Sequence, residues 1–251
     1  MQKCFEGVLL VFIISIFLEM KNTYAIFDLD GTLIDYEGAS HEAFMRVLAR
    51  FNKKFSKELH SAIIGTHHDS WSRKIIDAHQ LQDHITPTEF VQAYHDIIEE
   101  LIPTIPMMPG AAELLRSLKA NNIPVAIATS SSAKIVPKKI SHHPIITECV
   151  DILVTGDDPL VRNGKPAPDI FLLAAERLGC PNNTSALKKC IVFEDSPFGV
   201  LGGLNAGMRT VALPDPRFLT EESLREHERV FSRARWRLTS LSEFSLPSSD
   251  S

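Results

Sequence analysis

The sequence predicts an α/β fold: a doubly wound parallel sheet with an inserted all-helical cap. From residue 110 onward, short apolar strands alternate regularly with helices, which is the pattern of a parallel sheet covered on both faces. Between the first strand, 24–27, and the next, 125–128, the patterns are only helical, over far more chain than a parallel crossover needs. We therefore expect a whole helical subdomain to follow the first strand.

These patterns divide the chain into four parts. They are a leader of unassigned role, an α/β core in two pieces, the helical cap and a tail, at residues 1–23, 24–36 with 107–245, 37–106 and 246–251. The leader holds an apolar run, Val8–Leu18, which is too short for a comfortable membrane span of about 20 residues. The run does fit a signal peptide, and Met20 offers a later start. A signal, an anchor and an upstream start stay open, and we expect no stable membrane span.

Individual elements follow from hydrophobic periodicity and from capping residues. The last cap helix begins at Thr86, with Pro87 at its first position and Glu89 three residues on, which predicts a capping box. Cap helices are predicted at 39–52, 57–64, 72–79 and 86–101. Core helices are predicted at 111–119, 168–178 and 221–230, and one further helix each between 129 and 152 and after 197. Strands are predicted at 124–129, 152–154, 191–193, 210–213 and, weakly, 235–238.

Composition limits the function classes. The 251 residues carry a formal net charge of −5, so the chain lacks the basic footprint of a nucleic-acid-binding protein. Its cysteines stand apart, without a C-x-x-C pair, at positions 4, 149, 180 and 190. This spacing favours buried free thiols in a reducing compartment over a disulfide framework or a zinc site. We expect a cytoplasmic monomer without a nucleic-acid partner.

The first strand ends in an acidic turn, within Y-A-I-F-D-L-D-G-T-L-I-D at 24–35. Asp28 and Asp30 stand two residues apart at the end of a buried strand, where like charges raise each other's pKa unless a cation lies between them. A hard, oxygen-seeking Mg²⁺ accounts for such a pair. Gly31 lets the backbone turn sharply and leaves amide groups free to face an anion.

Polar residues also follow the other strands of the predicted sheet. Thr129 and Ser130 end the second strand, where a hydroxyl and the adjacent amides can bind a phosphoryl oxygen or cap a helix. Lys165 is fixed between a glycine and two prolines, where its ammonium could neutralise both a phosphate and Asp28. Glu194-Asp195 brings two more carboxylates to the same edge and, with Asp28 and Asp30, supplies oxygen ligands for Mg²⁺.

These four pieces resemble, in order, the four motifs of the haloacid dehalogenase superfamily of phosphohydrolases, over residues 24–245. The helical insertion resembles the cap of the beta-phosphoglucomutase-like branch. M-P-G-A-A-E-L-L-R-S-L, G-K-P-A-P-D-I-F-L and V-F-E-D-S-P-F-G-V are most similar to the pseudouridine-5′-phosphatase group. That group typically has asparagine where Phe198 stands, and Gly202-Gly203 is a second departure.

The resemblance implies a Mg²⁺-dependent phosphatase with a Rossmann-like core. Asp28 would be the nucleophile that forms an aspartyl-phosphate, and Asp30 would be the general acid and base. Thr129, Ser130 and Lys165 would bind the phosphoryl group. The metal would be held by Asp28, the Asp30 carbonyl and Asp195, with Glu194 as a further ligand.

The substrate is the least transferable part of the resemblance, because the cap selects the leaving group. Nucleoside, sugar and polyol phosphates are all candidates, with pseudouridine 5′-phosphate as the leading one. A beta-phosphoglucomutase-like sugar phosphate mutase uses the same residues, and a binding module that has kept the fold is a third possibility. His67 and His68 could touch a sugar hydroxyl, although a surface loop is their more ordinary setting.

Overall fold

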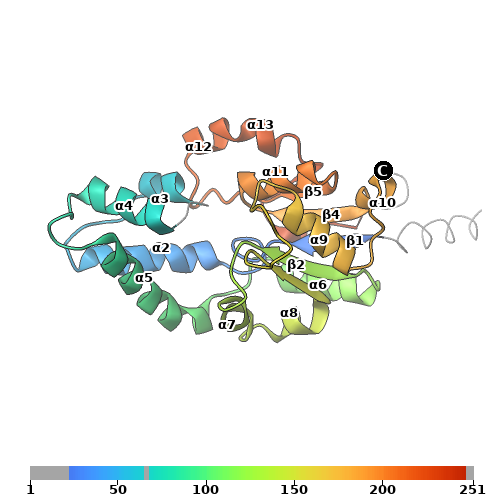
Figure 1. Cartoon of the computed structure of the whole chain (residues 1–251), viewed down its shortest axis with the longest axis horizontal. Coiled ribbons are helices and arrows are strands. Elements are labelled where there is room, and N and C mark those ends of the chain that lie inside the picture. The colour runs from blue at the N-terminus through green and yellow to red at the C-terminus, as the bar shows by residue number, and fades with distance from the viewer. Residues whose placement is uncertain (1–22, 65–67, 247–251) are drawn as a thin grey trace, which may run out of the picture.

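A six-stranded parallel sheet forms the centre of the molecule, which is a computed structural model that describes residues 23–64 and 68–246 (Figure 1). Its order is β3-β2-β1-β4-β5-β6. The strands are β1 Tyr24–Phe27, β2 Val125–Thr129, β3 Ile152–Thr155, β4 Cys190–Glu194, β5 Arg209–Ala212 and β6 Trp236–Arg237. Strand β1 is central, and Phe27 lies opposite Ile127 of β2 and Phe193 of β4. All carboxyl ends therefore meet at one edge, as predicted.

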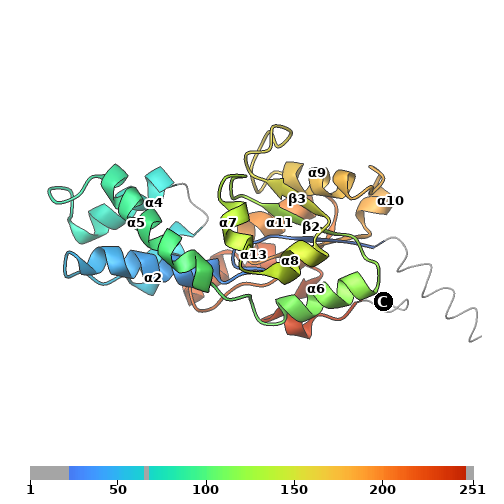
Figure 2. The same ribbon diagram turned by 90° about the horizontal axis from the view of Figure 1, so that it is seen from below.

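Helices cover both faces of this sheet. The core helices are α6 Ala111–Ala120, α7 Val136–Ile140, α8 Pro144–Cys149, α9 Asp169–Arg177, α10 Thr184–Leu187, α11 Pro197–Asn205, α12 Glu221–Glu226 and α13 Glu228–Phe231, with the 3-10 turns η1 Ile102–Thr104 and η2 Leu241–Glu243. Figure 2 shows α9 and α6 on opposite faces. Successive residues of β1 alternate accordingly: Ile26 packs in the cluster of α9, and Phe27 packs in the cluster of α6.

The segment between β1 and α6 forms helices and no strand in its described part, and its long helices lie off the carboxyl edge of the sheet (Figure 1). Its helices are α2 Tyr36–Ala49, α3 Lys57–Ile63, α4 His68–His79 and α5 Pro87–Leu101. Phe44, Trp71 and Tyr94 pack ring against ring at its centre, with centroids 4.6–5.1 Å apart. The predicted capping box of α5 is confirmed at Thr86 and Glu89. We refer to residues 37–106 as the cap, although its independence as a domain stays a prediction.

The helix boundaries differ from the predictions where local residues interrupt or extend the pattern. Helix α2 starts at Tyr36, because the carboxylate of Asp35 accepts the N–H of Gly38 at 3.0 Å and caps it. One helix predicted between β2 and β3 is two, and Pro144 opens the second. The helix predicted at 221–230 breaks at His227 into α12 and α13.

Two predictions concern ends of the chain and the thiols. The leader, the tail and His67 lie outside the described residues, apart from Thr23 and Leu246. Among the described helices, none combines the length and the apolar character needed to cross a membrane. Cys149, Cys180 and Cys190 are buried free thiols, as expected, and burial raises the pKa of Cys190.

Candidate active site

The first motif forms a tight turn directly beyond β1. The N–H of Asp28 donates to the carbonyl of Phe193 at 3.0 Å, so this residue still belongs to the pairing with β4. Gly31 then reverses the chain with a φ of +85°, which glycine adopts without strain. A β-carbon at position 31 would overlap the carboxylate of Asp195. The glycine therefore turns the loop and also lets the acid after β4 approach it.

Lys165 joins two of the predicted acids. Its ammonium donates to Asp28 Oδ1 at 2.5 Å and to Glu194 Oε1 at 2.6 Å, and all three side chains are more than 90% buried. Burial lowers the pKa of Lys165, but the two acids more than offset this, so the pKa lies above its usual value. The lysine is therefore a fixed cation in the site. It engages Oδ1 of Asp28, so Oδ2 is the oxygen of this carboxylate that remains for a reaction or a metal.

The charges of this cluster do not balance. Burial raises the pKa of Asp28 to about 8, although Lys165 opposes the shift. Burial, then Glu194 and Asp28, raise the pKa of Asp195 well above its usual range. One ammonium faces the buried carboxyl groups of Asp28 and Glu194, and Asp195 lies beside them, so the acids cannot all ionise without a further cation. An all-oxygen, acid-rich donor set of this kind fits Mg²⁺.

The contacts distinguish between the predicted metal ligands. Both oxygens of Glu194 are engaged, one by Lys165 and the other by the N–H and the hydroxyl of Ser196, at 2.9 and 3.0 Å. Asp195 accepts only the hydroxyl of Thr32, at 3.2 Å, among the contacts described. Within the described ranges, no three His, Cys, Asp or Glu side chains converge as a ready metal cluster. The donors that fit are therefore Asp28, Asp195 and a backbone carbonyl, and these contacts do not favour Glu194.

Asp30 is held on the other side of the turn by residues that the sequence did not single out. Lys139 Nζ donates to Asp30 Oδ1 at 2.7 Å, and the hydroxyl of Ser131 donates to Oδ2 at 2.8 Å. The ammonium of Lys139 also lies 3.3 Å from the ring centroid of Tyr36. No motif marks Lys139, which follows another lysine in a short helix. Only its burial distinguishes it, and burial is not visible in a local pattern.

The hydroxyls predicted to bind phosphate lie in different settings. Thr129 is buried at the end of β2, and its Oγ1 accepts the N–H of Ser131 at 3.1 Å. Ser130 is exposed, and the carbonyl of its backbone packs against Gly156. Of this loop, the Ser131 hydroxyl is the group seen in contact with Asp30, and the phosphate-binding role of Thr129 and Ser130 stays a prediction.

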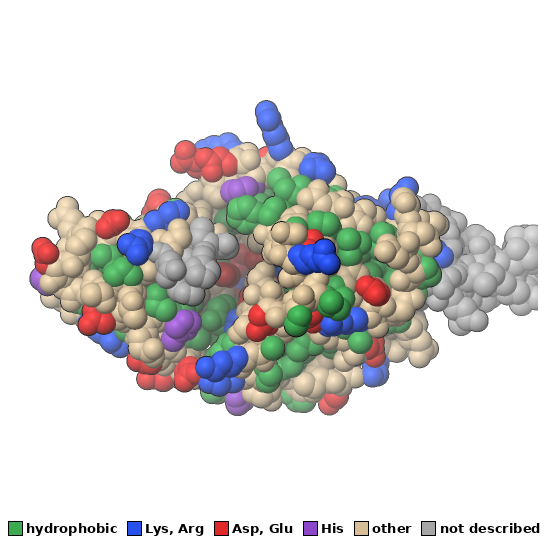
Figure 3. Space-filling view, in the orientation of Figure 1, with side chains coloured by type: hydrophobic (Ala, Val, Ile, Leu, Met, Phe, Trp, Pro, Cys, Tyr) green, Lys and Arg blue, Asp and Glu red, His purple; other side chains and the backbone are tan. Residues whose placement is uncertain are grey.

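A cavity of about 180 Å³ lies within the cap, where α2 meets α3, α4 and α5. Tyr36, Ser40, His60, Trp71 and Tyr94 belong to its lining. Glu37 lines this cavity and also a small gap that reaches Asp195, and His60 Nε2 lies 3.1 Å from its Oε2. Figure 3 shows acidic side chains at the base of the recess between the cap and the sheet. The cavity thus adjoins, through Glu37, the gap that reaches Asp195.

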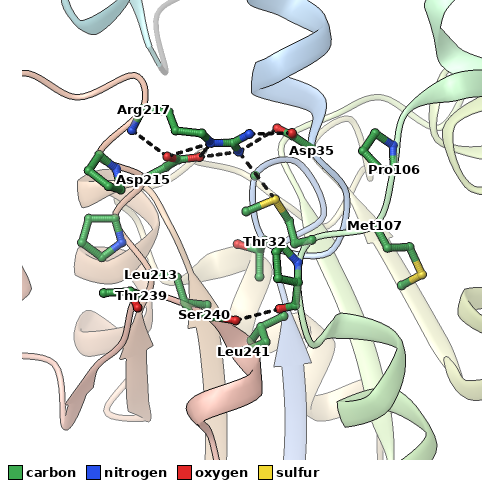
Figure 4. A pocket seen from close by; sticks show the side chains of 15 residues that line it. Thr32, Asp35, Pro106, Met107, Leu213, Asp215, Arg217, Thr239, Ser240 and Leu241 are labelled. Atoms are coloured by element: carbon green, nitrogen blue, oxygen red, sulfur yellow. Dashed lines mark hydrogen bonds and ion pairs between the residues drawn. The ribbon is translucent and has the colours of Figure 1, made fainter.

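A second cavity, of about 420 Å³, lies behind the first motif where the two cap connections meet the core. Met107, Pro109 and Leu213 give it an apolar lining. Arg217 crosses its mouth and pairs with Asp35 at 2.7 and 2.9 Å and with Asp215 at 2.6 Å (Figure 4). This double pairing ties the start of α2 to the loop after β5.

Comparisons with known proteins agree with this arrangement. (DL)-glycerol-3-phosphatase 2 of Arabidopsis thaliana is 38% identical over 78% of this chain and 80% of its own length. A Drosophila melanogaster protein named "Probable pseudouridine-5′-phosphatase" is 37% identical over 81% of this chain and 86% of its own.

Solved structures show the same architecture. A HAD family hydrolase from Deinococcus radiodurans R1, crystallised with phosphate and sodium, has a TM-score of 0.71 and 27% identity, covering 88% of this chain and 92% of that one. Beta-phosphoglucomutase from Clostridium difficile shares the fold, with a TM-score of 0.64 and 22% identity, covering 89% and 93%.

The predicted resemblance rested on motifs at four strand ends, and the family match extends over the cap and over the sheet as far as β5. The family described as haloacid dehalogenase-like hydrolase matches residues 25–213, which includes each predicted site residue. The chain therefore belongs to the haloacid dehalogenase-like hydrolase family.

Proposed function

We propose that the protein is a Mg²⁺-dependent phosphatase that hydrolyses a small phosphate monoester through an aspartyl-phosphate on Asp28. The observation that carries this proposal is the buried ammonium of Lys165 between Asp28 and Glu194, with Asp195 beside them. A fixed cation next to a nucleophilic carboxylate suits an anionic phosphoryl group. The named phosphatases among the relatives support the same reaction class.

The residues divide the reaction into two steps. Oδ2 of Asp28 attacks phosphorus, the bond to the leaving oxygen breaks, and Asp30 donates its proton to that oxygen. Asp30 then takes a proton from water, the water oxygen attacks phosphorus, and the bond to Asp28 breaks. This returns both carboxyl groups to their initial states and releases inorganic phosphate.

Other residues hold the transferring group. Lys165, the Thr129 hydroxyl and the amides around Ser130 would contact the phosphoryl oxygens. Mg²⁺, held by Asp28, Asp195 and the Asp30 carbonyl, would supply charge neutralisation between the acids and a dianionic ester.

The leaving group is proposed to be a nucleoside, sugar or polyol, with pseudouridine 5′-phosphate and glycerol 3-phosphate as the first substrates to try. The cap cavity has hydroxyl, carboxylate and aromatic groups in its lining, which suits a hydroxylated compound. We further propose a cytoplasmic monomer.

Phosphate release over a panel of pseudouridine 5′-phosphate, glycerol 3-phosphate, sugar phosphates and nucleotides tests the proposal. We expect turnover with Mg²⁺, loss in EDTA, and a fall of about 1,000-fold or more for Asp28→Asn. Asp77→Asn, an exposed acid of the cap, should leave turnover unchanged. Retained turnover in Asp28→Asn would end the mechanism. Isomerised sugar phosphate without phosphate release would establish a mutase instead.

A further inference from the structure

We propose that Lys139 is a positioning residue that fixes the carboxylate of Asp30 for proton transfer and links its placement to the first cap helix. The inference rests on the proposed function, in which Asp30 protonates the leaving group. Lys139 lies outside the four motifs and touches Asp30 rather than the reacting atoms.

The first observation is that both oxygens of Asp30 are held from one side. Lys139 Nζ donates to Oδ1 at 2.7 Å, Ser131 Oγ donates to Oδ2 at 2.8 Å, and Lys139 Nζ also donates to Ser131 Oγ at 3.0 Å. These contacts close a triangle, so the carboxylate cannot rotate without breaking two charge-assisted hydrogen bonds. Its orientation is therefore fixed before a substrate arrives.

The second observation is the contrast between two consecutive lysines of α7. The side chain of Lys138 is 50% exposed and pairs with Glu99 at 2.5 Å, as a surface lysine ordinarily does. The side chain of Lys139 is 2% exposed. Burying an ammonium is costly unless it is well compensated, and here Asp30, Ser131 and the Tyr36 ring supply the compensation. A lysine with only a structural role in this helix could stay exposed, as Lys138 does, and would avoid the free-energy cost of burying its ammonium.

The third observation concerns the cap. Tyr36 is the first residue of α2, and its ring covers the ammonium with 3.3 Å between Nζ and the centroid. If α2 moves away from the core, the ammonium loses its aromatic cover, and the hold on Asp30 changes with it. Acid geometry and cap position are thereby coupled.

A leaving-group comparison separates this role from a general structural one. An alkoxide needs a proton as it departs, whereas 4-nitrophenolate leaves without one. The value of kcat/KM includes phosphoryl transfer and leaving-group departure but not the later hydrolysis. Misplacing the acid should therefore lower kcat/KM for alkyl phosphates and spare 4-nitrophenyl phosphate. The ratio of the two values, measured in one sample, does not depend on the folded fraction.

The test compares Lys139→Met with the matched control Lys138→Met, using glycerol 3-phosphate and pseudouridine 5′-phosphate as alkyl esters. For Lys139→Met we expect the alkyl kcat/KM to fall about 10- to 100-fold and the aryl value to fall less than about threefold. Lys138→Met should change neither by more than about twofold. Tyr36→Leu should shift the ratio in the same direction by a smaller factor, and it replaces Lys139→Met if that variant does not fold.

Equal losses for alkyl and aryl esters, or an unchanged ratio, would overturn the role of Lys139. If the wild-type protein hydrolyses these esters but Lys139→Met has the same alkyl-to-aryl ratio of kcat/KM, this inference fails and the proposed phosphatase stands. A wild-type protein that hydrolyses none of them would remove both.

Discussion

Glu194 owes its position to a glycine on the following helix. Its carboxylate lies over the first turn of α11, where it accepts the N–H of Ser196, and a β-carbon on Gly199 would overlap it. Gly199 therefore permits the contact between Glu194 and Lys165, which in turn holds Asp28. The glycine follows Phe198, which is 44% exposed and touches neither acid in the contacts described. The departure at position 198 thus leaves this contact intact.

We predict that Gly199→Ala displaces Glu194 and loosens Lys165. The expected result is a loss of stability of about 1–3 kcal/mol, because the site is tightly packed. Turnover of the best panel substrate should fall at least about tenfold. Phe198→Ala is the control, because it changes the neighbouring residue of α11, which is 44% exposed and touches neither acid in the contacts described. Denaturant unfolding and phosphate release check both values, and an unchanged Gly199→Ala variant would contradict the packing argument.

The element that joins cap and core is the loop after β5. Arg217 pairs with Asp35, which is the N-cap of α2, and Lys57 of α3 donates to the carbonyl of Pro216 at 2.6 Å. Phe218 packs against His60 with ring centroids 4.8 Å apart. This loop therefore holds one side of the cap, as α7 holds the other.

We predict a modest effect for Arg217→Gln, because the side chain is 49% exposed and such pairs are screened by water. Losing both pairings should lower Tm by about 2–4 °C, with a smaller difference at high salt. Arg225→Gln is the control, since Arg225 is 75% exposed and pairs only loosely with Glu221. Thermal unfolding at low and high salt measures this, and a salt-independent loss would contradict an electrostatic role.

Strands and most helices could be predicted because their signals are local. The run Tyr24–Phe27 is apolar throughout, and Thr86 with Glu89 spells out a helix start. The roles of Lys139 and Arg217 could not be predicted, because the acids that they contact across the fold lie far away in the chain. Asp30 is 109 residues from Lys139, and Asp35 is 182 residues from Arg217. Sequence reasoning could name candidate site residues where a charged or hydroxyl side chain follows a strand. It missed residues that reach the site from a helix or a loop by tertiary packing alone.

The pair Gly202-Gly203 shows the same limit within one element. In the sequence it is only a departure from the expected motif. In the structure, a β-carbon on Gly202 would press on the ring of Phe171 of α9, and one on Gly203 would press on Thr210 and Val192 of the sheet. The glycines let α11 lie close to α9 and the sheet, which periodicity cannot indicate.

At the scale of the whole molecule, the acidic site links stability to pH and to divalent cations. Without metal, the pKa of Asp28 is about 8 in the folded state and near 3.8 in the unfolded state. Between these values the folded state binds more protons than the unfolded state, so this group makes stability fall as pH rises. A cation that binds the ionised acids should reverse the trend.

We therefore predict that, in EDTA, Asp28→Asn loses less stability than wild type between about pH 6.5 and about pH 8. Millimolar Mg²⁺ should raise the wild-type Tm more at the higher pH, where fewer protons compete with it. Thermal unfolding of both proteins at both pH values provides the measurement, and contributions from groups remote from Asp28 cancel in the comparison. Equal pH slopes for the two proteins in EDTA would refute the assignment.

The central position of β1 also has a consequence for biosynthesis. Its neighbours are β2 and β4, which begin at Val125 and Cys190. A ribosome releases β1 first, then the contiguous helices of residues 36–101, and only much later the strand that pairs with its second edge. A nascent chain shorter than about 190 residues therefore carries an apolar strand with an unpaired edge, the kind of surface that chaperones cover and that aggregation exploits. The helical insertion lengthens that exposure, so the segment that we propose to select the substrate would also delay completion of the sheet.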